Sequence, residues 1–391
     1  MVLLGVQPTN IEADVVKFGN SAALTRTYNR AVILDALRRT ESLSRVELAR
    51  LSGLTPQAVR NIVEDLLAEG FVKQIGRRKG LRGQPQIEVA INPDRGYSLG
   101  FHVTGSECRY LGTNLVGDVV FEGGAFKLTS DAAEIRRSLE QIEAACSQSM
   151  QDRARLGVGI AVSAPLAMPR HREPHSDYLE QVRTIQHFFG PDTWIENDAN
   201  AAAMAENLSG TAKERSDFLY IFIGAGVGGA IVRDSKLQRG YRGNAGEFGH
   251  ILVDPNGPQC HCGNRGCLHT YLSLAEFGDR IDRLGSDDGE IKAWLARAVP
   301  PLTRAIVTLE NAFDPDRIIL GGTAPGWLLE LLLAGVQEIL PSTCTDEAHQ
   351  RVEISRLGTT SALLGASALP LLNLMTPHPG LLTKQSLEGM R

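Results

Sequence analysis

The chain has 391 residues, enough for two or three domains, and its 43% hydrophobic and 22% charged residues can bury sizeable cores. It contains no run of eighteen apolar residues, and its start, MVLLGVQPTNIEADVV, lacks the basic residues and the cleavage site of a secretory signal, so we expect a cytoplasmic protein without a membrane segment. The formal net charge of −5 excludes an evenly basic surface, although a local basic segment can still contact the phosphates of a nucleic acid.

Residues 24–92 predict a small helical unit, and residues 1–23 before it read as a flexible tail. Apolar side chains at helical spacing predict a first helix over Asn29–Arg39. A second helix begins at Ser44, where the pattern S-x-x-E forms a capping box, and Gly53 ends it. The apolar side chains of this second helix are expected to be buried: Leu48, Ala49 and Leu51.

A third helix carries the side chains that are candidates for DNA contact. It begins after Thr55, an N-cap followed by proline, and Gly70 ends it, with an apolar and a polar face between them. Two helices joined by a glycine turn are typical of a helix-turn-helix, whose second helix enters the major groove, and a three-helix packing module is the alternative. Glu64 and Asp65 are expected to face away from the phosphates. The DNA-contact candidates on this helix are Thr55, Gln57, Arg60 and Asn61.

The next segment favours DNA binding over a packing module. FVKQIGRRKGLRGQPQIEVAIN predicts a strand, a glycine-rich tip and a second strand, with five basic residues and no acidic one from Lys73 to Arg82. A charge run is usually a solvated face, but directly after a recognition helix it is better explained as a wing that contacts phosphates or the minor groove. The candidates in the wing are Arg77, Arg78, Lys79 and Arg82. The expected partner is double-stranded DNA, and since paired half-sites need two heads, we expect a homodimer or homotetramer.

Residues 95–391 predict an α/β body, because apolar strands ending in glycine loops alternate with helices. Ligands in such folds bind where these loops converge. The string WIENDANAAAMAE places Asn197 and Asp198 at a strand-to-helix junction, where spacing alone favours Asp198 as an N-cap over a metal ligand or a general base. The string GNAGEFGHI places Glu247 and His250 at a glycine-rich bend. GAGVGG, between two apolar stretches, fits a tight hairpin or a phosphate cradle.

The segment CHCGNRGC predicts a metal site. Its three thiols cannot all pair with one another, a reducing compartment disfavours a disulfide, and the redox spacing C-x-x-C is absent. Gly263 and Gly266 let the chain turn back so that the thiolates of Cys260, Cys262 and Cys267 face one point, as a structural, tetrahedral zinc requires.

A closed zinc site needs a fourth ligand, and three histidines are candidates. His261 lies between two cysteine ligands, so we expect its side chain to point away from the ion. Spacing favours His250 over His269, because a ligand ten residues upstream closes a separate loop. Three buried cysteines that pack as small apolar side chains are the alternative, which so polar a segment disfavours.

Together these motifs resemble the ROK family, which joins sugar-responsive repressors to sugar kinases. NR..IL, SRVELARLSGLT and the basic wing resemble its repressor branch, and ENDANAAAMAE, GAGVGGAIV, GNAGEFGHI, CHCGNRGC and FDPDRIILGG resemble its body. The resemblance implies an N-terminal all-α winged helix-turn-helix and an α/β, actin-like (ribonuclease H-like) ATPase body of two lobes. It implies a zinc held by His250, Cys260, Cys262 and Cys267. It also implies that sugar hydroxyls bind Asn197, Asp198, Glu247 and His250, with Asp198 at the catalytic-base position of the kinases.

Two departures from the family pattern favour a regulator over a kinase. The kinases open the body with an Asp-x-Gly-Gly-Thr turn for ATP phosphate and magnesium, whereas this chain reads GFHVTGSE, with His102 in place of the aspartate. An imidazole does not replace an oxygen ligand of magnesium, so we expect phosphoryl transfer to be absent or very weak and assign no catalytic residue, with Asp198 as a vestigial base. The second departure is His269, where the family has a sugar-binding glutamate. It offers one donor and one acceptor, so the effector is expected to differ from a plain hexose or to be lost.

The sequence therefore predicts a DNA-binding transcriptional regulator that a sugar or sugar derivative controls, without ATP-dependent kinase activity. Asp198 is retained, which favours a ligand site that also includes His269. Two alternatives stay open: an active ROK sugar kinase with Asp198 as its base, and a regulator that has lost its ligand and responds to a protein partner.

Overall fold

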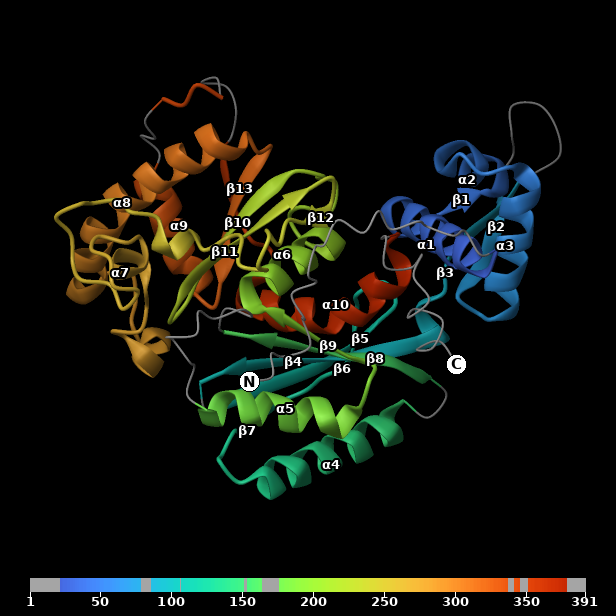
Figure 1. Cartoon of the computed structure of the whole chain (residues 1–391), viewed down its shortest axis with the longest axis horizontal. Coiled ribbons are helices and arrows are strands. Elements are labelled where there is room, and N and C mark those ends of the chain that lie inside the picture. Colours follow the sequence, from blue (N-terminus) through green and yellow to red (C-terminus); the bar gives the residue numbers. More distant parts are fainter. Residues whose placement is uncertain are drawn as a thin grey trace, which may run out of the picture.

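The computed structural model describes residues 22–78, 86–105, 107–150, 153–163, 176–336, 341–344 and 351–377. A small N-terminal head stands beside a body of two lobes, and each lobe is built on its own β-sheet (Figure 1). Two helices lie between these sheets, so the architecture is the predicted helical head with a two-lobed α/β body. Within the part of the chain described here, no helix combines the length and the apolarity needed to cross a bilayer.

The head consists of helices α1 (Ala22–Thr40), α2 (Arg45–Ser52) and α3 (Pro56–Ala68) with strands β1 (Leu43–Ser44), β2 (Val72–Arg78) and β3 (Gln86–Ile91). The strands form an antiparallel sheet in the order β1-β3-β2, which joins the wing to the turn before α2. Local signals set the helix ends as predicted. Ser44 and Glu47 make the capping box, Gly53 ends α2 in the left-handed region at φ 68°, and the Thr55 hydroxyl accepts the Ala58 N–H.

Two expectations about the head are wrong in detail. The first helix begins at Ala22 instead of Asn29, because the buried Leu24 extends its apolar face toward the N-terminus. Leu51 is 52% exposed instead of buried. The helix α2 has only eight residues, and Leu54, which follows the Gly53 turn, packs against the head core in its stead.

The N-terminal lobe has a six-stranded sheet in which β6-β5-β4-β8-β9 are neighbours in this order and β7 also pairs with β5. Strands β4, β8 and β9 are parallel, so their carboxyl ends lie at the same edge. Helices α4 and α5 cover one face, where they bury an apolar core (Figure 1). The elements of this lobe are β4 (Gly96–Thr104), β5 (Glu107–Asn114), β6 (Val119–Phe121), β7 (Ala125–Lys127), α4 (Ala132–Ser149), β8 (Ala154–Val162), α5 (Ser176–Phe189) and β9 (Thr193–Asn197).

The C-terminal lobe has a five-stranded sheet in the order β12-β11-β10-β13-β14, parallel across β10, β13 and β14 and antiparallel across β10, β11 and β12. Helices α8 and α9 cover its outer face and share with it the largest apolar core described (Figure 1). The elements are β10 (Phe218–Ile223), β11 (Val227–Arg233), β12 (Lys236–Leu237), α7 (His269–Leu272), α8 (Gly289–Phe313), β13 (Arg317–Gly322), α9 (Gly326–Gly335) and β14 (Val352–Ile354).

Helices α6 (Asp198–Ser209) and α10 (Ser361–Met375) lie side by side between the two sheets (Figure 1). Their small residues allow a close approach. A Cβ atom on Gly365 of α10 would lie 1.9 Å from the carbonyl oxygen of Ala201 in α6, so only glycine fits there. Both lobes therefore rest on one pair of helices, and α6 begins at Asp198, a predicted ligand residue.

The far end of α10 contacts the head. Leu371 and Met375 of this helix, together with Leu115, belong to the same buried cluster as the apolar side chains of the head. Polar contacts join head and body as well: Arg39 Nη1 donates to Ser235 Oγ at 2.9 Å, and Lys213 Nζ lies 3.4 Å from Glu41 Oε1. The head thus shares part of its core with the body.

Candidate functional site

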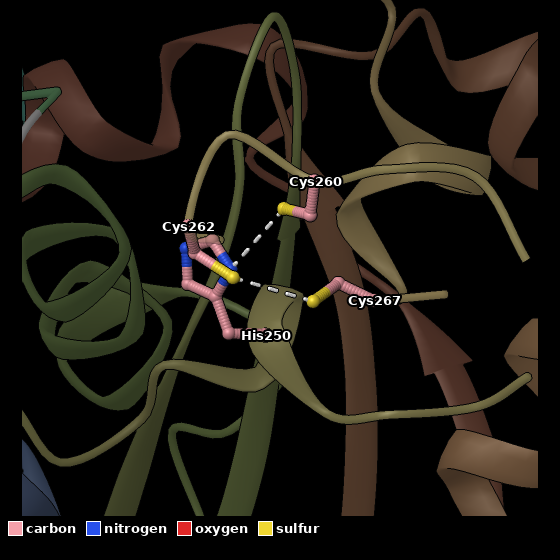
Figure 2. Close-up of side chains that lie close together, drawn as sticks. All are labelled: His250, Cys260, Cys262 and Cys267. Atoms are coloured by element: carbon pink, nitrogen blue, oxygen red, sulfur yellow. Dashed lines mark hydrogen bonds between the residues drawn. The ribbon is translucent and has the colours of Figure 1, made fainter. Parts of the chain in front are cut away.

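The structure brings together the four predicted metal ligands. One potential ligand atom from each of His250, Cys260, Cys262 and Cys267 lies within 4.8 Å of the others. Figure 2 shows the four side chains directed at a common centre. Gly263 and Gly266 have φ values of 95° and 66°, which confirms that glycine lets the loop fold back here.

The spacing of these atoms fits a tetrahedral zinc ion. Zinc–sulfur bonds of about 2.3 Å place ligand atoms about 3.8 Å apart, and here Cys262 Sγ lies 3.5 Å from Cys267 Sγ and Cys260 Sγ lies 3.7 Å from His250 Nδ1. Burial and the two neighbouring thiols raise the pKa of Cys267 to about 12. A divalent cation opposes this effect because it stabilises thiolates, so this donor set could hold a metal ion.

The other two candidate histidines lie outside this group of four. The Nδ1 of His261 lies 3.9 Å from Cys260 Sγ, and its ring centre lies 4.8 Å from that of His269. His269 Nδ1 accepts the N–H of Val227 at 3.3 Å. Burial lowers the pKa of His269 to about 4, and His261 and His250 add to the shift, so this side chain is neutral at pH 7.

The second group of polar side chains surrounds the start of α6. Asn197, not Asp198, is the N-cap, since Asn197 Oδ1 accepts the N–H groups of Ala199 and Asn200 at 3.0 and 3.4 Å. The expectation that Asp198 is the cap is therefore wrong: a helix has one N-cap, and the asparagine comes first in the chain.

Asp198 is the first residue of α6 and is 7% exposed. Its Oδ2 accepts a hydrogen bond from Ser163 Oγ at 2.7 Å and lies 4.0 Å from His102 Nε2. Ser163 follows β8 and His102 is in β4, so these two parallel strands and α6 meet at this point. The sequence reading singled out His102 only as a departure from a motif and missed Ser163. The parallel pairing of β4 with β8 is the signal from which the proximity of His102 and Ser163 could have been predicted.

The remaining predicted ligand residues lie around the same junction. Burial, and to a lesser extent the charge of Asp198, raises the pKa of Glu247. Strand β11 lies against the start of α6, because a Cβ atom on Gly228 would lie 3.5 Å from the Cβ atom of Ala199. The N–H of Val227, next to Gly228, donates to His269 Nδ1 and so links His269 to the same junction. The GAGVGG segment forms a tight hairpin between β10 and β11, the first of its two predicted forms.

The predicted DNA-contact residues of α3 lie on its exposed face. Thr55, Gln57, Arg60 and Asn61 are all exposed. Gln57 Nε2 donates to Asn61 Oδ1 at 2.9 Å, and Arg60 Nε donates to Glu64 Oε1 at 2.9 Å. Glu64 lies beside Arg60 because the i,i+4 spacing of a helix brings the two side chains together. Asp65 pairs with Arg26 of α1 at 2.5 Å.

The wing begins as predicted with strand β2, in which Arg77 and Arg78 pair with Ile87 and Gln86 of β3. Lys79 and Arg82, the other two predicted contacts, lie outside the described residues. Strand β2 begins four residues after α3 ends, so the wing directly follows this helix in the chain.

Comparison with known proteins identifies both parts of the chain. The profile of the ROK family matches residues 128–371, and a winged helix-turn-helix DNA-binding profile matches residues 28–73. The chain belongs to the ROK family. It is 30% identical over 371 residues to the xylose repressor of Bacillus spizizenii, an alignment that covers 88% of this chain and 95% of that one.

Solved structures of ROK proteins share the fold. A structure described as a ROK family transcriptional regulator, homolog of the E. coli MLC protein, covers 94% of this chain and 100% of its own, with a TM-score of 0.68 and 23% identity. A ROK hexokinase from Thermus thermophilus covers 75% of this chain and 99% of its own, with a TM-score of 0.54 and 22% identity. These likenesses confirm the predicted ROK architecture of head and body.

Proposed function

We propose that this ROK protein is a sugar-responsive transcriptional repressor. Residues 24–92 form its DNA-binding domain, residues 1–23 its tail, and residues 95–391 its ligand-binding domain. The observation that carries the proposal is the pairing of two features in one chain: an exposed recognition helix followed by a wing, and a polar junction at the start of α6. The likeness to a xylose repressor over most of both chains supports it.

The fold offers a route by which a ligand controls DNA binding. A sugar held at Asp198 contacts the first turn of α6, which packs along α10 between the lobes. The other end of α10 contributes Leu371 and Met375 to the head core. A ligand that binds one arrangement of the lobes more tightly than another shifts the population of molecules toward that arrangement. In a homodimer or homotetramer, this shift would also change the spacing of the DNA-binding heads. Operator binding requires access to the chromosome, so we place the protein in the cytoplasm.

Zinc has a structural role in this proposal. His250, Cys260, Cys262 and Cys267 would hold it in a closed set of four protein ligands, which leaves no position for a reacting water. The ion would fix the loop that carries His250 beside the predicted sugar-binding residues Asn197, Asp198, Glu247 and His269.

We infer that kinase activity is absent or very weak, because His102 stands in the sequence where the family kinases carry an aspartate for magnesium and phosphate. His102 Nε2 lies 4.0 Å from Asp198 Oδ2. A sugar kinase is the second candidate, and the observation in its favour is the buried, hydrogen-bonded carboxylate of Asp198. A coupled assay with ATP, magnesium and a panel of sugars distinguishes the two. Turnover that Asp198→Asn abolishes would establish the kinase and overturn this part of the proposal.

DNA binding is tested by selecting genomic fragments with the full-length protein and measuring gel shifts on the recovered operator. We expect Arg60→Ala to weaken binding by about 1–3 kcal/mol, and a sugar from the panel to release wild-type protein from the operator. Arg297→Ala removes an arginine of similar exposure from the body and serves as control. Equal affinity of the Arg60 variant and wild type, or no selected fragment at all, would contradict the assignment.

A further inference from the structure

His102 holds a buried polar atom without a partner. The side chain is 2% exposed, and within the described part of the chain its Nε2 makes no hydrogen bond. Buried ring nitrogens are normally hydrogen-bonded, because a buried polar atom that loses water without a replacement destabilises the fold. An unpaired nitrogen 4.0 Å from Asp198, a predicted ligand residue, therefore points to a partner that arrives with the ligand.

The strand places this nitrogen between the lobes. Alternate residues of β4 share a face, and Ser98 on this face donates from its hydroxyl to the carbonyl oxygen of Ser367 in α10 at 2.6 Å. Gly100, two residues on, lies directly against the backbone of α10. His102 continues the same face beyond this contact, where α6 begins with Asp198.

Asp198 can accept more hydrogen bonds than it receives. Its Oδ2 accepts from Ser163 Oγ at 2.7 Å and its Oδ1 accepts from the Ala199 N–H at 2.8 Å. Each carboxylate oxygen can accept two hydrogen bonds, so each has one position left. The 4.0 Å between Asp198 Oδ2 and His102 Nε2 is too long for a direct hydrogen bond. One oxygen atom can bridge the two at about 2.8 Å from each.

We propose that His102 is an effector-binding residue, which donates its Nε2–H to the same sugar hydroxyl that donates its proton to Asp198. This inference rests on the proposed function and adds a specificity to it. His102 and Asp198 together recognise a group that both donates and accepts a hydrogen bond. A free hydroxyl does both. A phosphate ester at this position has no proton to give to Asp198, and its charge would lie beside the carboxylates of Asp198 and Glu247. The effector therefore presents a free hydroxyl, and not a phosphate ester, at this position.

The test is calorimetric titration of the full-length protein with free xylose, glucose and N-acetylglucosamine and with their phosphate esters. We expect the sugar that binds best to bind at least about 10-fold more tightly than its ester at the recognised hydroxyl. His102→Leu removes the donor and is expected to weaken binding of this sugar about 10-fold, whereas His102→Gln, which keeps a side-chain N–H, retains most of the affinity. Operator affinity without sugar and the melting temperature of the Gln variant show whether the fold is intact.

Monodeoxy analogues of the best sugar identify the hydroxyl. The analogue that lacks the recognised hydroxyl is expected to bind the wild-type protein weakly. Its affinity for His102→Leu is expected to be no lower than for the wild type, because the substitution and the missing hydroxyl delete the same hydrogen bond. An ester at the identified hydroxyl that binds as tightly as the free sugar overturns this inference and leaves the proposed function standing. Equal sugar affinity of wild type and His102→Leu does the same. No binding by any sugar overturns both.

Discussion

At the scale of single residues, the metal cluster is the feature that short-range spacing determines most fully. All four candidate ligands come from one stretch, residues 250–267, so a glycine-rich loop is sufficient to bring them together. The thiol of Cys262 is the least buried of the three, yet it lies 3.5 Å from Cys267 Sγ. Its removal therefore tests the cluster with little damage to the surrounding core.

We expect the purified protein to contain about one zinc ion per chain and Cys262→Ser to lose most of it. The loss lowers the free energy of unfolding by about 3 kcal/mol when free zinc stands 100-fold above its dissociation constant. Metal analysis and thermal unfolding measure both effects. Cys344→Ser, which changes an exposed thiol, is the matched control and is expected to change neither. Equal zinc content in the two variants would exclude Cys262 as a ligand.

Glu206 is a second residue whose chemistry can be tested, because its side chain is fully buried in α6. Burial raises its pKa, although hydrogen bonds from Ser355 and from the Thr211 N–H oppose the shift. A carboxyl group with a raised pKa in the fold stabilises the protein below its unfolded pKa, and this contribution is lost as the pH rises through the folded pKa.

We therefore expect Glu206→Gln to melt at a higher temperature than wild type at pH 8 and the difference to shrink toward pH 5. The amide can keep both contacts, with its oxygen toward Thr211 N–H and its nitrogen toward Ser355 Oγ. Scanning calorimetry at several pH values measures the difference. A variant that is less stable than wild type by the same margin at every pH would show that the ionised carboxylate is needed.

The residues around Asp198 show where sequence reasoning stops. Asn197 and Asp198 are adjacent in the chain and were predicted, although the cap was assigned to the wrong one of them. His102 and Ser163 come from two other strands and reach Asp198 only through the parallel pairing of β4 with β8. Spacing within one motif cannot reveal a contact that depends on strand order.

At the scale of elements, the helices of the head could be predicted because their ends are local. The capping box at Ser44, the left-handed Gly53 and the Thr55 cap each depend on residues within four positions of one another. The packing of Leu51 could not be predicted, because the short helix α2 presents it to solvent while Leu54 fills the core. Whether Leu51 or Leu54 packs against the core depends on the helices and strands around them. The local sequence pattern carries no information about these neighbours.

The exposed face of α3 leads to a prediction about DNA affinity. Glu64 lies beside Arg60 and also 3.8 Å from Arg45, so it neutralises part of the face proposed to meet phosphates. We expect Glu64→Gln to increase operator affinity by roughly 0.5 kcal/mol, about twofold, since exposed ion pairs are worth this order. Gel shifts at two salt concentrations measure it, and the gain is expected to be larger at low salt.

Glu290→Gln, which frees Arg280 in the body from a comparable exposed pair, controls for net charge alone. If both variants bind DNA equally more tightly than wild type, the effect is one of total charge and α3 is not the contacting helix.

At the scale of the whole molecule, α10 determines how the parts are held together. It lies along α6 between the two sheets and ends in the head core (Figure 1). The contact between α10 and the head joins residues that are far apart in the sequence, so no local sequence pattern predicts it. The order of the strands is equally non-local, since β10 pairs in parallel with β13 across nearly a hundred residues of intervening chain. The two-lobed fold could be expected only from the family resemblance.

We expect Leu371→Ala to lower the free energy of unfolding by about 2–5 kcal/mol and also to weaken operator binding, because the cavity lies where α10 meets the head. Leu302→Ala makes a similar cavity in the core of the C-terminal lobe and is expected to reduce stability alone. Urea unfolding and gel shifts below the unfolding transition measure the two effects. Equal operator affinity of the two variants would show that the head is positioned independently of α10.

The shared core also limits how such proteins can be recombined. A DNA-binding unit cut out at the boundary before β4 would carry away the surface against which Leu371, Met375 and Leu115 pack, and would leave these three apolar side chains facing water on the remaining body. A chimaera that joins this head to the sensor of a relative therefore requires the last turns of α10 to be transplanted with it. During the evolution of this protein, the apolar residues of the head and of α10 that contact one another are expected to have changed together, although they lie far apart in the sequence.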